Sequence, residues 1–497
     1  MPDSIPILTI ILFLPALGAI FVGLLPRSDR GIKVTAAIFS GIAFVLSLWV
    51  FAAFDRSATG LQFVEQVSWI PAINAQYFLG VDGLSVMLLF LTTFLGFLSV
   101  FISWSITTRV REYFIWLLIL ETSLIGVFVS LDFLLFFIFW EIEMVPMYFL
   151  ISIWGTPPPL GRKEYSAIKY ILYTFTGSAM LLAGILVTYF QTGSWNMMEI
   201  GGLATGLSMG MQTLMFFLIF FCFAVKLPMF PLHTWLPDAH TDAPTAGSVI
   251  LAGVLIKMGG YGMIRACVSM FPGVSRDYAP LLVTLAVVSI IYGAIVTLRQ
   301  TDLKRLIAYS SISHMGYVLL GIFALTQLSL TGAALQMFSH GLITGLLFAM
   351  VGIVYEHSHE RRIPLMGGLA RQMPIAAVIF TVAGLASLGL PTTSGFAAEF
   401  ITFMGSFNSN AFPAIQIYVV IGILGIVLTA GYILWMLERV FYKETKEEFN
   451  DVPDANGRER AVIFTFTIAI MVIGIFPQIL TDIIKVAVLP IAQAVGL

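Results

Sequence analysis

Ionisable side chains lie inside long apolar runs of this sequence, where an isolated charge is expensive. They include acids and bases on separate runs: Glu121, Glu141, Glu143, Lys226, Lys257, His314, His340 and Glu399. One such group at the centre of a membrane helix costs roughly 2.5–3.5 kcal/mol on insertion scales. Titratable groups contributed by several helices favour a chain of proton-exchanging sites across the protein interior, which is a proton relay. The alternative is a set of ion pairs that only hold helices together.

The members of this set differ in their suitability for proton transfer. Glu141 and Glu143 are two residues apart and point about 200° away from each other on a helix, so only one can face a given path. We expect Glu141 to face the relay and Glu143 to lie near an interface or partner. His340 is a further candidate for the relay. At His233, which flanks a proline-rich break, capping or local hydrogen bonding competes with proton transfer.

Two prolines interrupt the apolar run that contains Lys226. Pro228 and Pro231 cannot donate a hydrogen bond to the carbonyls four residues earlier, those of Ala224 and Leu227. In hydrocarbon, such freed carbonyls are tolerated only beside protein or water. The sequence therefore predicts an unwound helix and a polar cavity next to the lysine.

A second run repeats this arrangement, because Pro391 frees the carbonyl of Ser387 and Glu399 follows two turns later. Interrupted helices at corresponding positions of two halves are typical of a transport site. The halves extend over 113–270 and 280–441. With five helices each, the second half starts on the opposite side of the membrane, so the repeat is predicted to be inverted.

The elements that position these groups are membrane helices. With 59% hydrophobic residues, 10% charged residues and a mean hydropathy of +0.97, the 497-residue chain is too apolar for a soluble fold. One crossing takes about 20 apolar residues. We expect an all-α integral membrane protein, a single polytopic domain over 1–497. Fourteen helices are predicted. The first three, within 1–108, are near 5–26, 34–54 and 78–104. The others are near 113–131, 133–154, 166–191, 210–236, 244–270, 280–298, 303–325, 328–355, 374–405, 414–441 and 461–484.

The basic residues predict the orientation of these helices. If the N-terminus is outside, nineteen of the twenty-five Lys and Arg residues flank the cytoplasmic ends, three lie outside and three lie within spans. Basic residues concentrate in cytoplasmic loops. Because Arg27, Arg30 and Lys33 follow the first apolar run rather than precede it, we expect this run to be an uncleaved anchor.

Four segments resemble the antiporter-like subunits of respiratory complex I. They read FWE at 139–141 with VPMY at 145–148, VKLPMFPLHTWLPDAH at 225–240, APTAGS at 243–248, and DLKRLIAYSSISHMG at 302–316. The resemblance covers almost the whole chain. Glu399, where a lysine would indicate a sister subunit, is similar to the subunit M (ND4-type) branch. The family usually has Gly before this acid, whereas Ala397 and Ala398 stand here.

The resemblance implies a function and a role for each candidate. The chain would be a proton-translocating membrane subunit of bacterial NADH-quinone oxidoreductase, part of an enzyme but without a redox site of its own. Glu141 and Lys226 match the family's ion pair, Lys257 and His314 its central relay, and Glu399 its exit group. NADH, FMN, iron–sulfur clusters and quinone would belong to partner subunits, and neighbouring antiporter-like subunits would be its contacts in the bacterial inner membrane.

The sequence is compatible with some other functions and excludes several more. The shared motifs also fit a subunit of a multi-subunit Na⁺/H⁺ antiporter or a membrane hydrogenase; a quinone-binding enzyme and a structural spacer are further alternatives. The net charge of −2 is too small to attract nucleic acid. Cys222 and Cys267 lie in apolar runs and cannot form an iron–sulfur site, and no phosphate-binding loop is present. His357 and His359 are expected to be solvated, so no metal is predicted.

Overall fold

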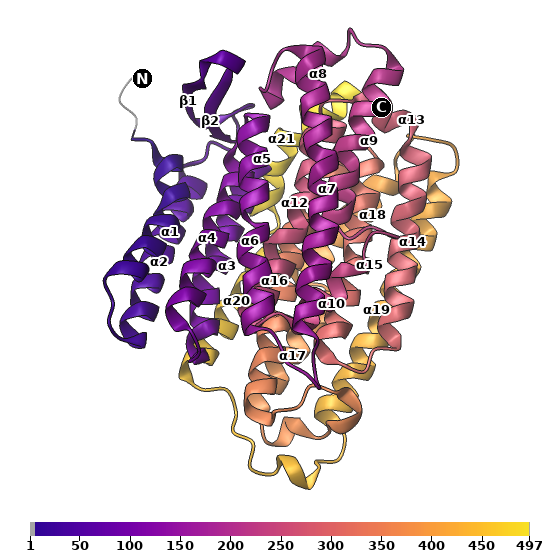
Figure 1. The fold of residues 1–497 in the computed structure, drawn as a ribbon. Coiled ribbons are helices and arrows are strands. Elements are labelled where there is room, and N and C mark those ends of the chain that lie inside the picture. The colour runs from indigo at the N-terminus through magenta and orange to yellow at the C-terminus, as the bar shows by residue number, and fades with distance from the viewer. Residues whose placement is uncertain (1–4, 497) are drawn as a thin grey trace.

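The computed structural model describes residues 5–496 and is dominated by long helices that run side by side (Figure 1). Among the described residues, thirteen helices are long and apolar enough to cross a membrane. The expected all-α integral membrane fold is therefore confirmed. These helices include α1 (Ile7–Leu24), α2 (Asp29–Ala53), α3 (Ser85–Ile102), α4 (Val110–Val129), α7 (Lys163–Thr192), α9 (Met209–Lys226), α14 (Ala279–Leu298), α15 (Leu303–Phe323), α16 (Gln327–Ser358) and α19 (Ile415–Leu437).

Several predicted spans consist of two or more helical pieces. The turn expected at 130–132 separates α4 from α5 (Phe133–Ile142), which continues after a kink as α6 (Met144–Trp154). The seventh span consists of α9 and α10 (Trp235–Asp242), and the twelfth of α17 (Pro374–Ser387) and α18 (Ser394–Phe407). Both predicted breaks are confirmed. The eighth span contains α11 (Thr245–Ile250), α12 (Ile256–Gly262) and two π-helical turns.

The predicted start of the third span is wrong, because a β-hairpin occupies this region. Strands β1 (Gln62–Ile70) and β2 (Ala75–Val81) pair antiparallel, and α3 begins only at Ser85. The hairpin is tied to the bundle by Glu65, whose carboxylate accepts hydrogen bonds from the backbone N–H groups of Leu8 (2.7 Å) and Thr9 (3.1 Å) in the first turn of α1. Those groups have no partner within the helix, so the acid caps it.

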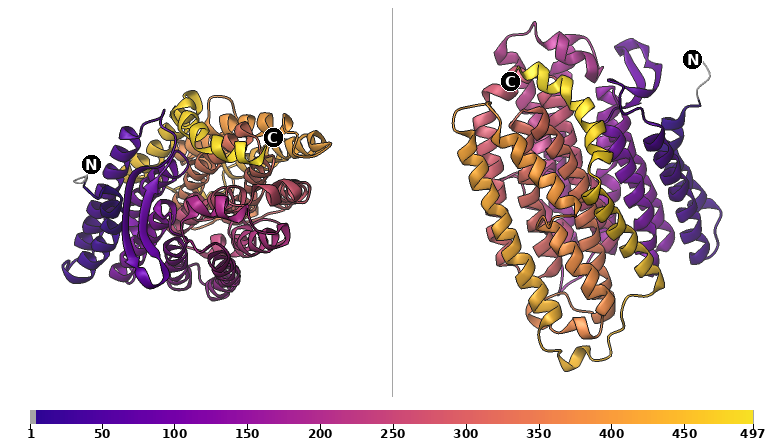
Figure 2. Two further views of the ribbon diagram at one scale, coloured as in Figure 1. Left: turned by 90° about the horizontal axis from the view of Figure 1, so that it is seen from above. Right: turned by 180° about the vertical axis from the view of Figure 1, so that it is seen from behind.

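The predicted last span is also wrong, since 461–484 contains the end of one helix and the start of another. α20 (Gly457–Ile475) stops before Pro477, and α21 (Gln478–Val495) follows. A residue before a proline disfavours helical backbone, and Phe476 accordingly leaves the helical conformation, with φ −123° and ψ 62°. Figure 2 shows α21 lying across the end of the bundle that also carries the hairpin.

The interior of the bundle is formed by the helices that carry the central candidates. The eighth span and α16 are buried along their lengths, whereas much of α1 and α2 is exposed at the rim. The hairpin and both ends of the described chain lie at one end of the bundle, and the loop 443–456 lies at the other (Figures 1 and 2). Titratable groups on the central helices are thus shielded from lipid by the surrounding helices.

Candidate functional site

The break in the seventh span lies directly beside Lys226, the last residue of α9. Other donors satisfy two carbonyls that the break frees. The N–H of Met229 donates to the carbonyl of Ala224 at 3.0 Å, and the indole N–H of Trp235 donates to the carbonyl of Val225 at 2.9 Å. The unwound backbone is therefore supported by the protein around it, and Lys226 is buried beside the break.

Lys226 forms a buried ion pair with Glu143, and not with Glu141 as expected. The hydroxyl of Tyr170 donates to the other carboxylate oxygen of Glu143 at 3.0 Å, and the ammonium lies 5.5 Å from the centroid of the Trp140 ring. Glu141 is only partly buried. The two acids do point different ways, but Glu143 occupies the kink between α5 and α6, and this position turns its side chain toward α9.

Lys257 is fully buried at the centre of the eighth span. Its ammonium donates to the carbonyl of Ala252 and lies 2.7 Å from Nδ1 of His340 on α16. Two π-turns, Leu251–Leu255 and Met263–Val268, flank this part of the helix. Such turns widen a helix locally and often occur at functional sites. Here the first turn presents a carbonyl oxygen to the lysine.

Glycines bring the backbones of these helices close together. A Cβ atom on Gly341 of α16 would lie 2.7 Å from the carbonyl oxygen of Gly253, and one on Gly259 would lie 2.7 Å from the backbone nitrogen of Leu227. Neither distance is compatible with a side chain. The first contact sets the separation of the helices that bear Lys257 and His340, and the second packs the eighth span against the break in the seventh.

From His340 the set of titratable groups continues to the second broken helix. The ring centroids of His340 and His314 are 5.4 Å apart. Nδ1 of His314 lies 3.3 Å from a carboxylate oxygen of Glu399, and its Nε2 lies 3.3 Å from the hydroxyl of Ser387, at the end of α17. Gly389 has left-handed backbone (φ +79°) in the break, and a Cβ there would lie 2.8 Å from the carboxylate. The break thus gives Glu399 room to face the interior.

Two of the singled-out residues lie apart from this row. The ring of His233 packs against that of Tyr292, with centroids 5.0 Å apart, in the irregular segment between α9 and α10. Glu121 on α4 is buried and accepts hydrogen bonds from the hydroxyl of Ser40 on α2 at 2.8 and 3.0 Å. The structure brings together Lys257, His340, His314 and Glu399 in one row and Lys226 with Glu143 in a separate pair, and it leaves Glu121 and His233 outside both.

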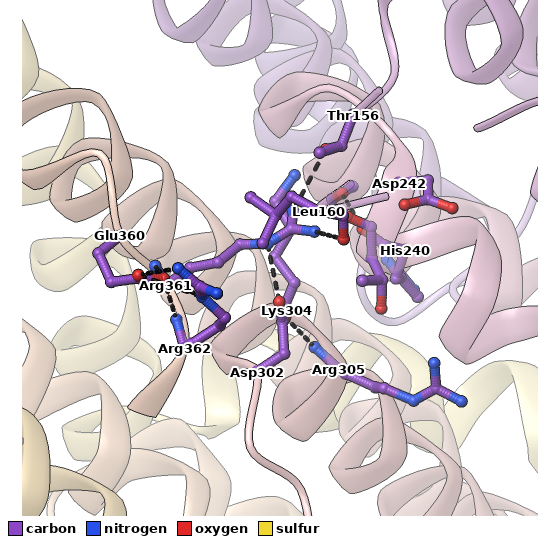
Figure 3. Close-up of polar contacts among 12 residues, drawn as sticks. Thr156, Leu160, His240, Asp242, Asp302, Lys304, Arg305, Glu360, Arg361 and Arg362 are labelled. Atoms are coloured by element: carbon purple, nitrogen blue, oxygen red, sulfur yellow. Dashed lines mark hydrogen bonds and ion pairs between the residues drawn. The ribbon is translucent and has the colours of Figure 1, made fainter. Parts of the chain in front are cut away.

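A cluster of cations closes the bundle near the end of α10 (Figure 3). The fully buried Arg361 pairs with Asp302 at 2.7 Å and donates to the carbonyl of Thr241 at 2.8 Å. Lys304 donates to the carbonyl of Ala243 at 2.6 Å. These cations bind carbonyls at the C-terminal end of α10, where the helix dipole favours positive charge. Arg361 is one of the nineteen basic residues counted at the cytoplasmic ends, and no pattern in the sequence indicates its burial.

A buried row of one lysine, two histidines and one carboxylate lies between two broken helices, and each of these side chains can take up and release a proton. Within the described residues, no cluster of three or more His, Cys, Asp or Glu side chains is arranged to hold a metal ion. Broken helices beside buried titratable groups are typical of membrane transport proteins.

Comparison with known proteins identifies the family. Residues 130–429 match the family described as NADH:quinone oxidoreductase/Mrp antiporter, TM. The chain is 41% identical to NADH-quinone oxidoreductase subunit M of Rhodobacter capsulatus, over 98% of this chain and 96% of that protein. It is 42% identical to NAD(P)H-quinone oxidoreductase chain 4 1 of Synechococcus elongatus, over 99% and 92%. The chain belongs to this family, and the expected likeness to subunit M is confirmed.

Solved structures agree with this assignment. A chain of respiratory complex I from Thermus thermophilus with bound NADH superposes with a TM-score of 0.87 at 26% identity, covering 98% of this chain and all of that one. A chain of the Mrp complex from a Dietzia species superposes with a TM-score of 0.86 at 20% identity, covering 98% and 99%. The second likeness concerns the fold alone.

Proposed function

We propose that this chain is a proton-translocating membrane subunit of NADH-quinone oxidoreductase, and that protons cross it through the buried titratable groups. The observation that carries the proposal is the continuous row from Lys257 to His340 (2.7 Å), His314 (5.4 Å between ring centroids) and Glu399 (3.3 Å from His314). Each group can hold or release a proton, and the steps between them are short enough for direct transfer or for transfer through one water molecule.

The ion pair at Lys226 acts as the switch of this relay. At about 4 Å and an effective dielectric constant near 20, a lysine and a carboxylate attract each other by about 4 kcal/mol. Opening the pair with Glu143 removes this attraction, so Lys226 releases its proton toward Lys257 more readily. Glu141, which is partly exposed near the end of α5, two residues before Glu143, serves as the second acid of the switch. His233 lies to the side of the row, against Tyr292, and serves at the entrance.

The energy for this cycle comes from partner subunits. NADH is oxidised and quinone is reduced there, with FMN and iron–sulfur clusters as the electron carriers, and neighbouring antiporter-like subunits pass the conformational signal to this chain. The names of its relatives support such an assembly. The chain lies in the bacterial inner membrane with its N-terminus outside and its basic loops in the cytoplasm, consistent with the distribution of Lys and Arg.

Two inverted five-helix units, 113–270 and 280–441, form the working part of the subunit. Each contains a broken helix, α9–α10 in the first and α17–α18 in the second, next to a titratable group, Lys226 or Glu399. The two breaks flank the central row. This arrangement supports alternating exposure of the row to opposite sides of the membrane.

A substitution at the centre of the row tests the proposal. Lys257→Ala should abolish most NADH-driven acidification of inverted membrane vesicles while the complex still assembles, because His340 loses its proton donor. Lys485→Ala, which removes an exposed lysine on α21, is the control and should pump normally. Dye quenching reports the acidification, and native gels report assembly. Normal pumping by an assembled Lys257→Ala complex would rule out the relay.

A further inference from the structure

A small cavity lies beside α16, near the end of the bundle where the loop 443–456 is found. Its volume is about 90 Å³, and it is lined by residues of α3, α11, α16 and α20 and their adjoining turns. One water molecule needs about 10–15 Å³ by the same measure, so the cavity has room for several. None of the relay groups lines it. We refer to it as the α16 cavity.

The charged side chains that line the α16 cavity are two acids, Glu356 and Glu459, and one arginine, Arg458. Glu356 is exposed there and accepts a hydrogen bond from the hydroxyl of Ser105 at 2.5 Å. Glu459, on the opposite wall, lies 3.0 Å from Nε2 of His357. Carboxylates in a narrow opening concentrate cations, hydronium included. Because two carboxylates outnumber the single guanidinium of Arg458, the lining attracts protons from the adjoining solution.

The neighbouring route into the bundle has the opposite character. Arg361 and Lys304 fill the end of α10, and Figure 3 shows them gathered around the segment that leads to His240. Their positive charges repel protons. The acid beside them, Glu360, is not a proton carrier, because hydrogen bonds from Arg362 lower its pKa to about 2 and keep it charged.

A row of residues on α16 runs from the cavity to the relay. Glu356, Gly352, Phe348, Thr344 and His340 recur at every fourth residue, so each lies next to the following one, and the row winds by about 160° around the helix over its length. The first two line the cavity, and the last is the relay histidine. Thr344 lies between the aromatic ring and the relay, with its hydroxyl 3.4 Å from Nδ1 of His340.

A buried histidine packs against the middle of this row. The ring of His240 stacks on that of Phe348 with centroids 4.6 Å apart, and it is fully buried with no hydrogen-bond partner for either nitrogen within the described residues. The hydroxyl of Ser248 donates to its carbonyl at 3.0 Å. After α10 ends at Asp242, the chain leads to Thr245, the first residue of α11, which packs against Gly352 and lines the α16 cavity. A buried imidazole without partners next to a hydrated cavity can take up and release a proton.

We propose that the α16 cavity is the water-filled entry through which protons reach the central relay, with Glu356 as the group that collects them. A proton passes from water to the Glu356 carboxylate, from there to water in the cavity, and then past Thr245 and His240 to His340. The proposal rests on the relay described under Proposed function and names the side from which the relay is loaded.

Blocking the cavity with a reversible label tests this entry. Ala349 lines it and is 2% exposed. We would introduce Ala349→Cys into an assembled complex in which Cys222 and Cys267 of this chain are alanine, and treat inverted vesicles with a cationic methanethiosulfonate. The parent with Ala349 receives the same reagent as the control. Modification should lower NADH-driven acidification several-fold, and dithiothreitol should restore it. A cysteine that does not react, or that reacts without loss of pumping, would overturn the proposal.

A second variant checks the collecting group. Glu356→Gln should slow pumping and Glu356→Asp should restore much of it, whereas Glu438→Gln, an exposed acid at the end of α19, should have no effect. Equal rates for Glu356→Gln and the wild type would remove Glu356 from the path. The relay itself is judged separately. If Lys257→Ala stops pumping and the blocked cavity does not, the entry alone is wrong; if Lys257→Ala pumps normally, the relay is wrong.

Discussion

The buried pair of Lys226 and Glu143 allows proton transfer to be distinguished from helix association. The side chains are 2% and 1% exposed, so Glu143→Gln leaves the lysine ammonium without its counter-charge in the interior. Breaking such a pair costs about 3–5 kcal/mol. Since every 1.4 kcal/mol is tenfold, the folding equilibrium would shift by roughly 100- to 5,000-fold if Lys226 remained charged.

A lysine that exchanges protons can avoid this cost by losing its proton. The relay therefore predicts that the Glu143→Gln complex assembles but pumps poorly, because Lys226 no longer holds a proton to pass on. Helix association predicts the opposite. Little complex should then assemble, and the double variant Glu143→Gln/Lys226→Met should restore both assembly and pumping, since no unpaired charge is left.

Native gels and dye quenching in inverted vesicles measure the two quantities on the same preparation. Glu143→Asp, which keeps the charge, and Glu141→Gln, which leaves the Lys226 ion pair intact, are the matched controls, and both should assemble normally. Assembled Glu143→Gln complexes that pump at the wild-type rate would refute the switch. Loss of assembly that the double variant rescues would show that the pair serves packing alone.

Two further predictions concern packing and topology. Gly341→Ala should reduce pumping and cost about 1–3 kcal/mol of stability, because the new methyl group would lie 2.7 Å from the carbonyl oxygen of Gly253 and push His340 away from Lys257. Gly431→Ala is the control, since its methyl group would meet its nearest neighbour at 3.8 Å, and it should change neither the melting temperature nor pumping in vesicles. Single cysteines replacing Asn450 and Gly60 should react with impermeant reagents from the cytoplasmic and the outer side respectively, and labelling of both from one side would overturn the orientation.

The broken helices were predictable because their cause is local. A proline removes its own N–H wherever it stands, so the unwinding near Pro228 and Pro391 follows from the residue type alone. The membrane fold and the burial of Lys257, His314 and Glu399 were equally predictable, since long apolar runs have few stable alternatives in lipid. One local signal was missed, Pro477, which follows the end of α20.

The partner of Lys226 was decided only by the tertiary structure. Periodicity states that Glu141 and Glu143 point apart, but not which of them faces α9, because that depends on the kink between α5 and α6 and on the position of α7 with Tyr170. The same holds for His340. Its 2.7 Å contact with Lys257 depends on a π-turn and on two glycines, 88 residues apart in the chain, that bring two backbones together. Residue types and local spacing therefore determine the helices, their breaks and the chemistry available in this protein, whereas the choice of which buried charges meet is made by the packing of distant segments.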